Sequence, residues 1–219
     1  MPLTDLEIES LFKFTQKKFV HYYDLQVELV DHLASSIEDE IDENPTLSFE
    51  QALQKVYKRF GIFGFAKVVQ EREEALRKNN NRIWWRAVKE FFTIPKVALT
   101  AALFFSVLLI GQMLLPEAKL IILFLFWVFI KCIDIREHRI SNKIKIKNLL
   151  LTQNTSFFSF SGIWFPYTFF LREGLPFENN YVFAIAIVVV FIFESAVIQV
   201  NKEVRKKAME LYPEAFVLA

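Results

Sequence analysis

The chain has 219 residues, of which 25 are phenylalanine, 53% are hydrophobic and 23% are charged. Its single cysteine, Cys132, excludes a disulfide-rich secreted scaffold, a zinc finger and an iron–sulfur cluster. The net charge is +1, but residues 1–81 contain 10 Lys and Arg against 15 Asp and Glu, while residues 82–219 contain 16 against 10. This segregation predicts an acidic soluble domain followed by a membrane domain with basic flanks. The basic residues crowd around apolar segments, so nucleic-acid binding is not expected.

The first 81 residues have the pattern of a small all-α bundle. Thr4 and Glu7 have the spacing of a capping box, which predicts a first helix directly after Thr4. Its expected apolar stripe contains Leu6, Leu11 and Phe14. A second helix is predicted from about Tyr23 to Glu43, because apolar residues recur there at every fourth position. These are Leu25, Leu29, Leu33, Ile37 and Ile41.

The second helix is expected to turn an acidic face outward. This face contains Glu28, Glu38, Asp39, Glu40, Asp42 and Glu43. Ser48 and Gln51 predict a second capping box and a third helix, which Gly61 is expected to end in a left-handed conformation. The expected core residues of that helix are Phe49, Leu53, Val56, Tyr57 and Phe60. A fourth helix is predicted after Gly64 and is expected to end near residues 79–81.

A short interfacial segment is predicted at residues 82–96. Trp side chains favour the boundary between headgroups and hydrocarbon, and Arg side chains favour anionic headgroups. The expected membrane-interface anchors are Arg82, Trp84, Trp85 and Arg86. We expect a short amphipathic helix that lies on the membrane surface before Pro95.

Four apolar segments between residues 97 and 200 predict a four-helix transmembrane domain. The expected spans are residues 97–115, 118–133, 149–171 and 181–200. Sixteen Lys and Arg residues fall on one side of this arrangement, and only Lys119 and Arg172 fall on the other. The positive-inside rule therefore predicts a multi-pass protein with both termini in the cytoplasm, including a cytoplasmic tail at residues 201–219.

Glu194 is the most informative single residue, because an ionisable group within a membrane span is costly and often functional. Lys131 lies near the same membrane depth in the second expected span, and helical side chains lean toward the helix N-terminus. We expect the two residues to form an intramembrane pair if their helices are neighbours. The pair has two interpretations of about equal weight, a packing contact or part of a functional site.

Other polar clusters suggest chemistry less strongly. Glu28 and His32 could reach one metal ion, but a metal site needs three or four ligands, so a surface hydrogen bond is the preferred interpretation. The cluster after the second span is interpreted as a solvated loop and comprises Asp134, Glu137, His138 and Arg139. Polar residues at 152–161, including Gln153 and Asn154, would either line a hydrated path or hold helices together. No enzyme motif is present, and neither catalytic residues nor cofactors are expected.

Short motifs in the N-terminal part resemble a known domain. Asp31-His32-Leu33, Glu50-Gln51-Ala52 and Phe60-Gly61 resemble motifs of the HAAS domain. The family usually has Pro where this chain has Ile62. HAAS domains are short helical cytoplasmic domains of bacterial multi-span membrane proteins, often encoded beside PadR-like regulators. The resemblance covers about a third of the chain and is greatest to small Bacteroidota membrane proteins. It implies a location in the bacterial inner membrane and a signalling role.

Together these features predict a non-enzymatic membrane protein whose N-terminal domain is a cytoplasmic interaction module. The expected partners are the lipid bilayer, a cytoplasmic protein, which the resemblance suggests is PadR-like, and a second copy of the chain. One alternative is a small transporter or channel component that uses Glu194 and the polar third span. An enzyme at the membrane surface ranks last, because it would need a motif that the sequence lacks.

Overall fold

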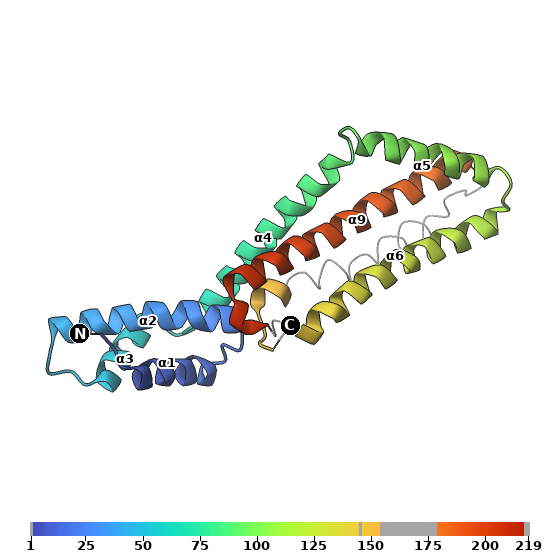
Figure 1. Cartoon of the computed structure of the whole chain (residues 1–219). Helices are drawn as coiled ribbons and strands as arrows, with labels where there is room; N and C mark the ends of the chain where they lie inside the picture. Colours follow the sequence, from blue (N-terminus) through green and yellow to red (C-terminus); the bar gives the residue numbers. More distant parts are fainter. Residues whose placement is uncertain (1, 145, 154–178, 217–219) are drawn as a thin grey trace. The chain divides into compact units, whose positions relative to one another are not determined.

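The computed structural model describes residues 2–144, 146–153 and 179–216. These residues are almost entirely helical, with no strand beyond a single bridge residue at Phe216, which confirms the expected all-α class. The elements are α1 (Asp5–Lys17), α2 (Tyr23–Glu43), α3 (Phe49–Lys58), α4 (Ala66–Glu90), α5 (Lys96–Gly111), α6 (Pro116–Ile144), α9 (Asn180–Leu211) and the 3₁₀ helix η2 (Pro213–Ala215) (Figure 1).

The chain divides into two compact units. The first unit comprises residues 1–77, 145–153 and 208–219, and the second comprises residues 78–144 and 154–207. The first unit therefore includes two segments that the sequence pattern assigned to the membrane domain and the C-terminal tail. Helices α4 and α9 each contribute residues to both units.

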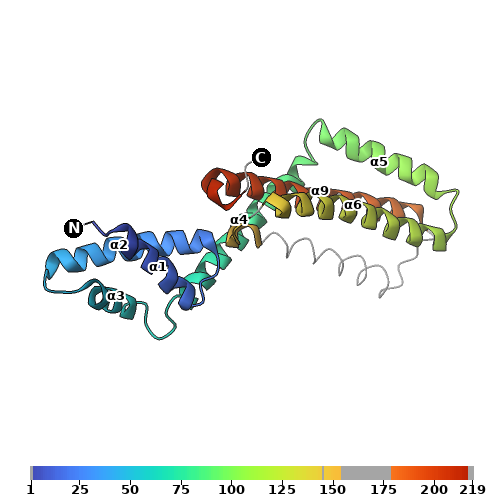
Figure 2. The same ribbon diagram turned by 60° about the horizontal axis from the view of Figure 1, so that its bottom comes forward.

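The first unit is built on the expected helix signals. Thr4 with Glu7, and Ser48 with Gln51, both form reciprocal capping boxes at the starts of α1 and α3. Helix α2 begins and ends at the predicted residues, and it packs against both α1 and α3. Figures 1 and 2 show α1 and α2 side by side in this unit. Its buried core contains Leu11, Leu25, Leu29, Leu33, Ile37, Ala52, Leu53, Val56 and Phe65.

Two expected side-chain positions in the first unit are wrong. Leu6 is 77% exposed, because a helical repeat of about 3.6 residues places it roughly 140° around α1 from the buried Leu11. Glu40 is buried rather than on the acidic surface, since it lies one heptad after Leu33 on the inner face of α2. Its carboxylate forms ion pairs with Lys55 and Arg59.

Helix α1 ends in a left-handed residue that is not glycine. The Val20 amide donates to the carbonyl of Thr15, and the Phe19 amide donates to that of Gln16, which together form a Schellman motif. Phe19 occupies its left-handed position with φ = 66°, where glycine is usual. Its side chain is 83% exposed.

Helix α4 corrects the prediction of a short interfacial helix. It continues through the asparagine run at residues 79–81 and ends at Glu90, so residues 82–90 are the second half of one long helix. Asn80 is buried, and Ala87, Val88 and Phe91 pack against Ile192 and Ala196 of α9. This tertiary burial outweighs the modest helix propensity of three asparagines.

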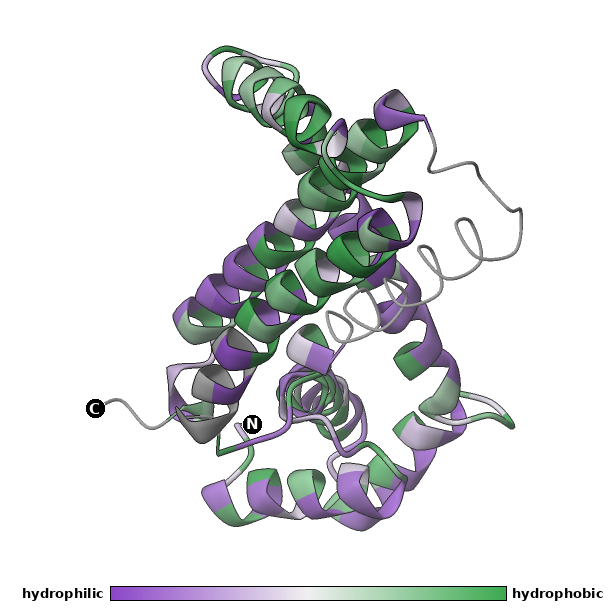
Figure 3. Cartoon of the chain, turned by 90° about the vertical axis from the view of Figure 1, so that its right-hand side faces the viewer, coloured by the Kyte–Doolittle hydropathy of each residue, from purple (hydrophilic) through white to green (hydrophobic). Residues whose placement is uncertain are grey.

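The second unit contains the apolar helices. Among the described residues, α9 is the one helix long and apolar enough to cross a membrane, and α5 is a shorter apolar helix. Leu123 of α6 shares a buried cluster with Phe183, Ala186, Ile187 and Val190 of α9. Figure 3 shows hydrophobic residues concentrated in these helices.

The structure thus supports one of the four expected spans by length and composition. The expected second span lies within α6, whose apolar part is flanked by Glu117, Lys119, Lys131 and Asp134. Instead of a loop after residue 133, this helix continues to Ile144. Most of the expected third span, from residue 154 onward, lies outside the described residues. Its first residues, Leu149–Leu151, are buried and belong to the first unit.

Candidate functional site

A buried polar site joins α6 and α9 in the second unit. Lys131 Nζ lies 2.6 Å from Glu194 Oε2, and the two side chains are only 9% and 8% exposed. The indole Nε1–H of Trp127 donates to the other carboxylate oxygen of Glu194 at 3.0 Å. The structure therefore brings together the two residues that the sequence paired, and adds Trp127 one helical turn before Lys131.

Further polar contacts extend along the same two helices. Lys119 Nζ donates to Asn180 Oδ1 at 2.6 Å near the starts of both helices. Asn201 Nδ2 donates to Asp134 Oδ1 at 2.8 Å, beyond the Lys131–Glu194 pair. Because residue numbers increase together along these contacts, α6 and α9 run parallel, which Figures 1 and 2 also show.

Protein side chains occupy both oxygens of the Glu194 carboxylate, so we call this site closed. The Glu194 carboxylate has a cation on one oxygen and an indole donor on the other. A carboxylate that carried ions or protons along a path would need access to water or to a chain of polar groups. Gln153, which the transport alternative requires, is exposed in the first unit, and Asn154 lies outside the described residues. The pair is therefore interpreted as a structural contact that holds α6 and α9 together.

The basic and aromatic half of α4 forms a second candidate site. A groove of about 610 Å³ runs along one face of this helix and is lined by Arg82, Trp85, Arg86, Lys89, Glu90 and Thr93. Trp85 is exposed, whereas the ring of Trp84 packs edge-on against Phe193 at a centroid distance of 5.0 Å. Of the two tryptophans expected at the membrane interface, only Trp85 therefore presents its ring outward.

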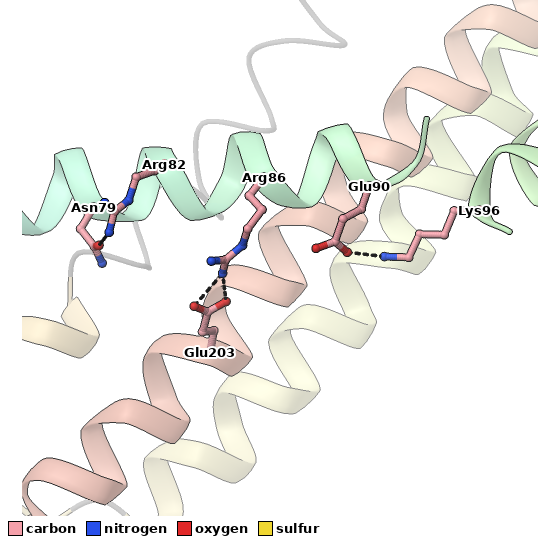
Figure 4. Close-up of polar contacts among 6 residues, drawn as sticks. All are labelled: Asn79, Arg82, Arg86, Glu90, Lys96 and Glu203. Atoms are coloured by element: carbon pink, nitrogen blue, oxygen red, sulfur yellow. Dashed lines mark hydrogen bonds and ion pairs between the residues drawn. The ribbon is translucent and has the colours of Figure 1, made fainter. Parts of the chain in front are cut away.

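Two ion pairs fix the charges beside this groove (Figure 4). Arg86 donates through Nη2 to both oxygens of Glu203, at 2.8 and 2.6 Å, and these bonds raise the pKa of its guanidinium. Lys96 Nζ donates to Glu90 Oε2 at 2.7 Å and lowers the pKa of that carboxyl. Arg82 bonds Asn79 Oδ1 at 3.1 Å. Arg82 and Lys89 thus leave this face positively charged, which suits an anionic headgroup.

Sequence reasoning missed the most specific polar contact of the first unit. Asp24 is buried at the start of α2, and its two carboxylate oxygens accept the backbone N–H groups of Leu150 and Leu151 at 2.8 and 2.9 Å. These amides begin a helical turn at residues 150–153, where a carboxylate is favoured by the unsatisfied N–H groups and the helix dipole. The partners are 126 and 127 residues apart, so no local pattern could have revealed the bond.

Neighbouring contacts bring several segments of the chain together at this point in the first unit. The Tyr23 amide donates to the carbonyl of Asn148 at 2.7 Å, and Lys147 Nζ lies 3.6 Å from the centre of the Tyr23 ring. The same ring packs edge-on against Tyr212 of the C-terminal segment at 6.5 Å. The Ile146 amide donates to the carbonyl of Ala215. Three distant parts of the chain therefore meet at the start of α2.

The remaining sequence candidates lie on the surface or in the core of the first unit. Glu28 pairs with Arg72 at 3.3 Å rather than with His32. Of the residues that match the HAAS motifs, Asp31 and His32 are exposed, Leu33 and Ala52 are buried, and Gly61 has φ = 71°. Within the described part of the chain, no three metal-ligating side chains form a cluster. The side chains of Glu137 and His138 are outside the described set.

Comparisons with known proteins give no match. No family model, curated protein or solved structure is similar to this chain.

Proposed function

We propose that this protein is a non-enzymatic, four-span membrane protein whose N-terminal helices form a regulatory module coupled to the membrane helices. The observation that carries the proposal is the bond between Asp24 and the amides of Leu150 and Leu151. Residues 145–153 follow α6 and include the first residues of the expected third span, so a module that holds this segment can respond to, or restrain, the chain that follows it.

The direction of α6 and α9 supports the four-span topology. Parallel neighbouring helices require the chain to return along their length between the end of α6 and the start of α9. The part of the expected third span that follows residue 153 is the apolar segment available for this return. The bias of Lys and Arg toward one side supports placing both termini and the first unit in the cytoplasm.

The first unit has the features of an interaction module rather than of a passive anchor. It exposes the large apolar side chain of Leu6 on α1. It also retains an acidic surface on α2. A soluble cytoplasmic protein is the proposed partner, and the HAAS-like motifs suggest a transcription regulator of the PadR type. The closed Lys131–Glu194 pair makes the transport alternative weaker.

Hydrogen exchange of the full chain in lipid nanodiscs tests the coupling. Asp24→Asn should speed exchange of the Leu150 and Leu151 amides by roughly tenfold or more, because a hydrogen bond to a charged group contributes about 1.5–3 kcal/mol. Asp31→Asn is the matched control, since Asp31 is exposed on the same helix. Glu194→Gln in the second unit should alter exchange at residues 150 and 151 only when Asp24 is intact.

Two results would contradict the proposal. If Asp24→Asn leaves the amide exchange rates of residues 150 and 151 unchanged, the hydrogen bonds from these amides to Asp24 are not formed in the membrane. Exchange that responds to Asp24→Asn but never to Glu194→Gln would mean that the two units act independently, and the first unit would then not be a coupling module.

A further inference from the structure

The first unit carries an unusual cluster of exposed apolar side chains. Ile62 is 100% exposed, Phe63 is 76% exposed and Phe19 is 83% exposed. Large apolar groups that gather on a surface generally mark a binding site rather than an accident of packing.

The local backbone presents these side chains outward. Ile62 and Phe63 stand between Gly61 and Gly64, which have φ values of 71° and 51° and therefore form a tight turn. Phe19 sits in the left-handed position that ends α1, where glycine would avoid the steric cost. A phenylalanine in a strained, exposed position is a candidate for a functional side chain.

The turn at residues 61–64 and the end of α1 lie around one aromatic ring. Lys18 Nζ lies 4.6 Å from the centre of the Tyr57 ring. A Cβ atom added at Gly64 would collide with the hydroxyl of Tyr57, so the turn passes directly against the same side chain. Phe65, which follows the turn, also packs edge-on against Tyr57. The end of α1 and the turn that carries Ile62 and Phe63 are therefore neighbours.

The two chain segments that carry this surface are rich in basic residues. Residues 10–23 and 51–70 contain seven Lys and Arg and no Asp or Glu, although residues 1–81 as a whole are acidic. Four of the seven pair with acidic residues from outside these segments, namely Lys13, Lys55, Arg59 and Lys67. Lys17 and Lys58 are exposed, and Lys18 lies over Tyr57.

We infer that Phe19, Ile62 and Phe63, with Lys17 and Lys58, form a membrane-contact surface for anionic phospholipids. Apolar side chains that enter the interface, next to lysines that meet anionic headgroups, are the combination by which peripheral segments bind bilayers. The inference rests on the proposed membrane location, which keeps a lipid surface within reach of this unit. An acidic protein partner would meet the same lysines and apolar side chains, and quenching by lipid distinguishes the two.

Fluorescent labelling of the full chain tests this contact. Cys132→Ser removes the native thiol, and a nitrobenzoxadiazole label is placed at Phe63→Cys in vesicles of phosphatidylcholine with or without phosphatidylglycerol. Lipids with a doxyl quencher should quench this label several-fold more when phosphatidylglycerol is present. A label at Leu6→Cys is the matched control, because Leu6 is equally exposed but lies at the other end of α1. It should remain unquenched.

Two substitutions separate lipid contact from folding. Lys17→Gln with Lys58→Gln should reduce quenching at residue 63 to the level of residue 6, while lowering the melting temperature only slightly, because both lysines lie in the last turn of a helix. Phe19→Gly should raise the melting temperature of the unit by relieving the left-handed strain, and should also reduce the quenching. A purely structural role for Phe19 would not combine greater stability with weaker lipid contact.

Each contrary result has a distinct meaning. Equal quenching at residues 6 and 63, or quenching at 63 that ignores phosphatidylglycerol, overturns the inference. If the label at residue 63 is shielded from water but is not quenched by doxyl lipids, it contacts protein rather than lipid. That result also overturns the inference. A label at Leu109→Cys in α5 reports the membrane location itself, since Leu109 is exposed on an apolar helix. Quenching at 109 but not at 63 refutes only the lipid surface, whereas quenching at neither refutes the membrane location as well.

Discussion

Removing one member of the Lys131–Glu194 pair should cost more than removing both. Both side chains are more than nine-tenths buried. Glu194→Gln keeps the side-chain shape and an oxygen for the Trp127 indole, but leaves the Lys131 ammonium without its counter-charge. Breaking a buried pair in this way costs about 3–5 kcal/mol. Lys131→Met should cost a similar amount, because the carboxylate would keep only the indole hydrogen bond.

The double substitution separates the pair from its two members. Lys131→Met with Glu194→Gln leaves two neutral side chains of nearly native shape, and replacing a buried ion pair with neutral groups is often nearly without cost. We expect the double variant to lose only about 1 kcal/mol, which with single losses of about 3 kcal/mol or more gives a coupling energy of at least about 5 kcal/mol between the two sites. Lys202→Met, at an exposed position on α9, is the control and should change little.

Unfolding in mixed detergent micelles with rising dodecyl sulfate measures these losses. Strictly additive losses would refute the pair.

Three further predictions concern the core, the junction and the topology. Leu33→Asp should destabilise the first unit by about 4 kcal/mol, since it places a charge in a fully buried position, and faster amide exchange in α2 would show it. Burial, followed by the charge of Asp24, raises the pKa of the Tyr212 hydroxyl. The unfolded chain therefore loses this proton first above about pH 10, so stability should fall with rising pH in that window, and less steeply in Asp24→Asn. Reporter fusions after Asn148 should give cytoplasmic signals and fusions after Glu117 should not; a far-side signal after Asn148 would exclude the four-span topology.

Sequence patterns predicted the elements whose determinants are local. The two capping boxes and the bounds of α2 depend on residues within one or two helical turns, so spacing alone located them. The Lys131–Glu194 contact was also predictable, because membrane depth fixes a residue's level along its helix and a buried charge has few possible partners. Both cases succeed because only a few arrangements satisfy the physical constraint.

The errors arise where residue type was given more weight than position, or where packing outweighed propensity. Glu40 was placed with its acidic neighbours on the surface, although its heptad spacing from Leu33 places it on the buried face. Leu6 was placed in the core because it is apolar, although its angle around α1 turns it outward. The asparagine run suggested a helix end, but the second half of α4 gains enough contact with α9 to continue the helix.

The junction at Asp24 belongs to a different class, because its partners are set by the tertiary fold alone. Leu149 and Leu150 are 0% and 2% exposed, and Ala215 and Phe216 are also buried, although all four belong to segments that lie far from residues 1–77 in the sequence. A fragment that ended at residue 81 would lose this buried surface and would leave the Asp24 carboxylate without its two amide partners, which is costly for a buried charge. The first unit is therefore incomplete as a domain until the segment after α6 and the C-terminal segment have been made. We propose this dependence as the physical basis for coupling: the module would reach its full stability only while residues 150 and 151 keep the conformation that Asp24 binds.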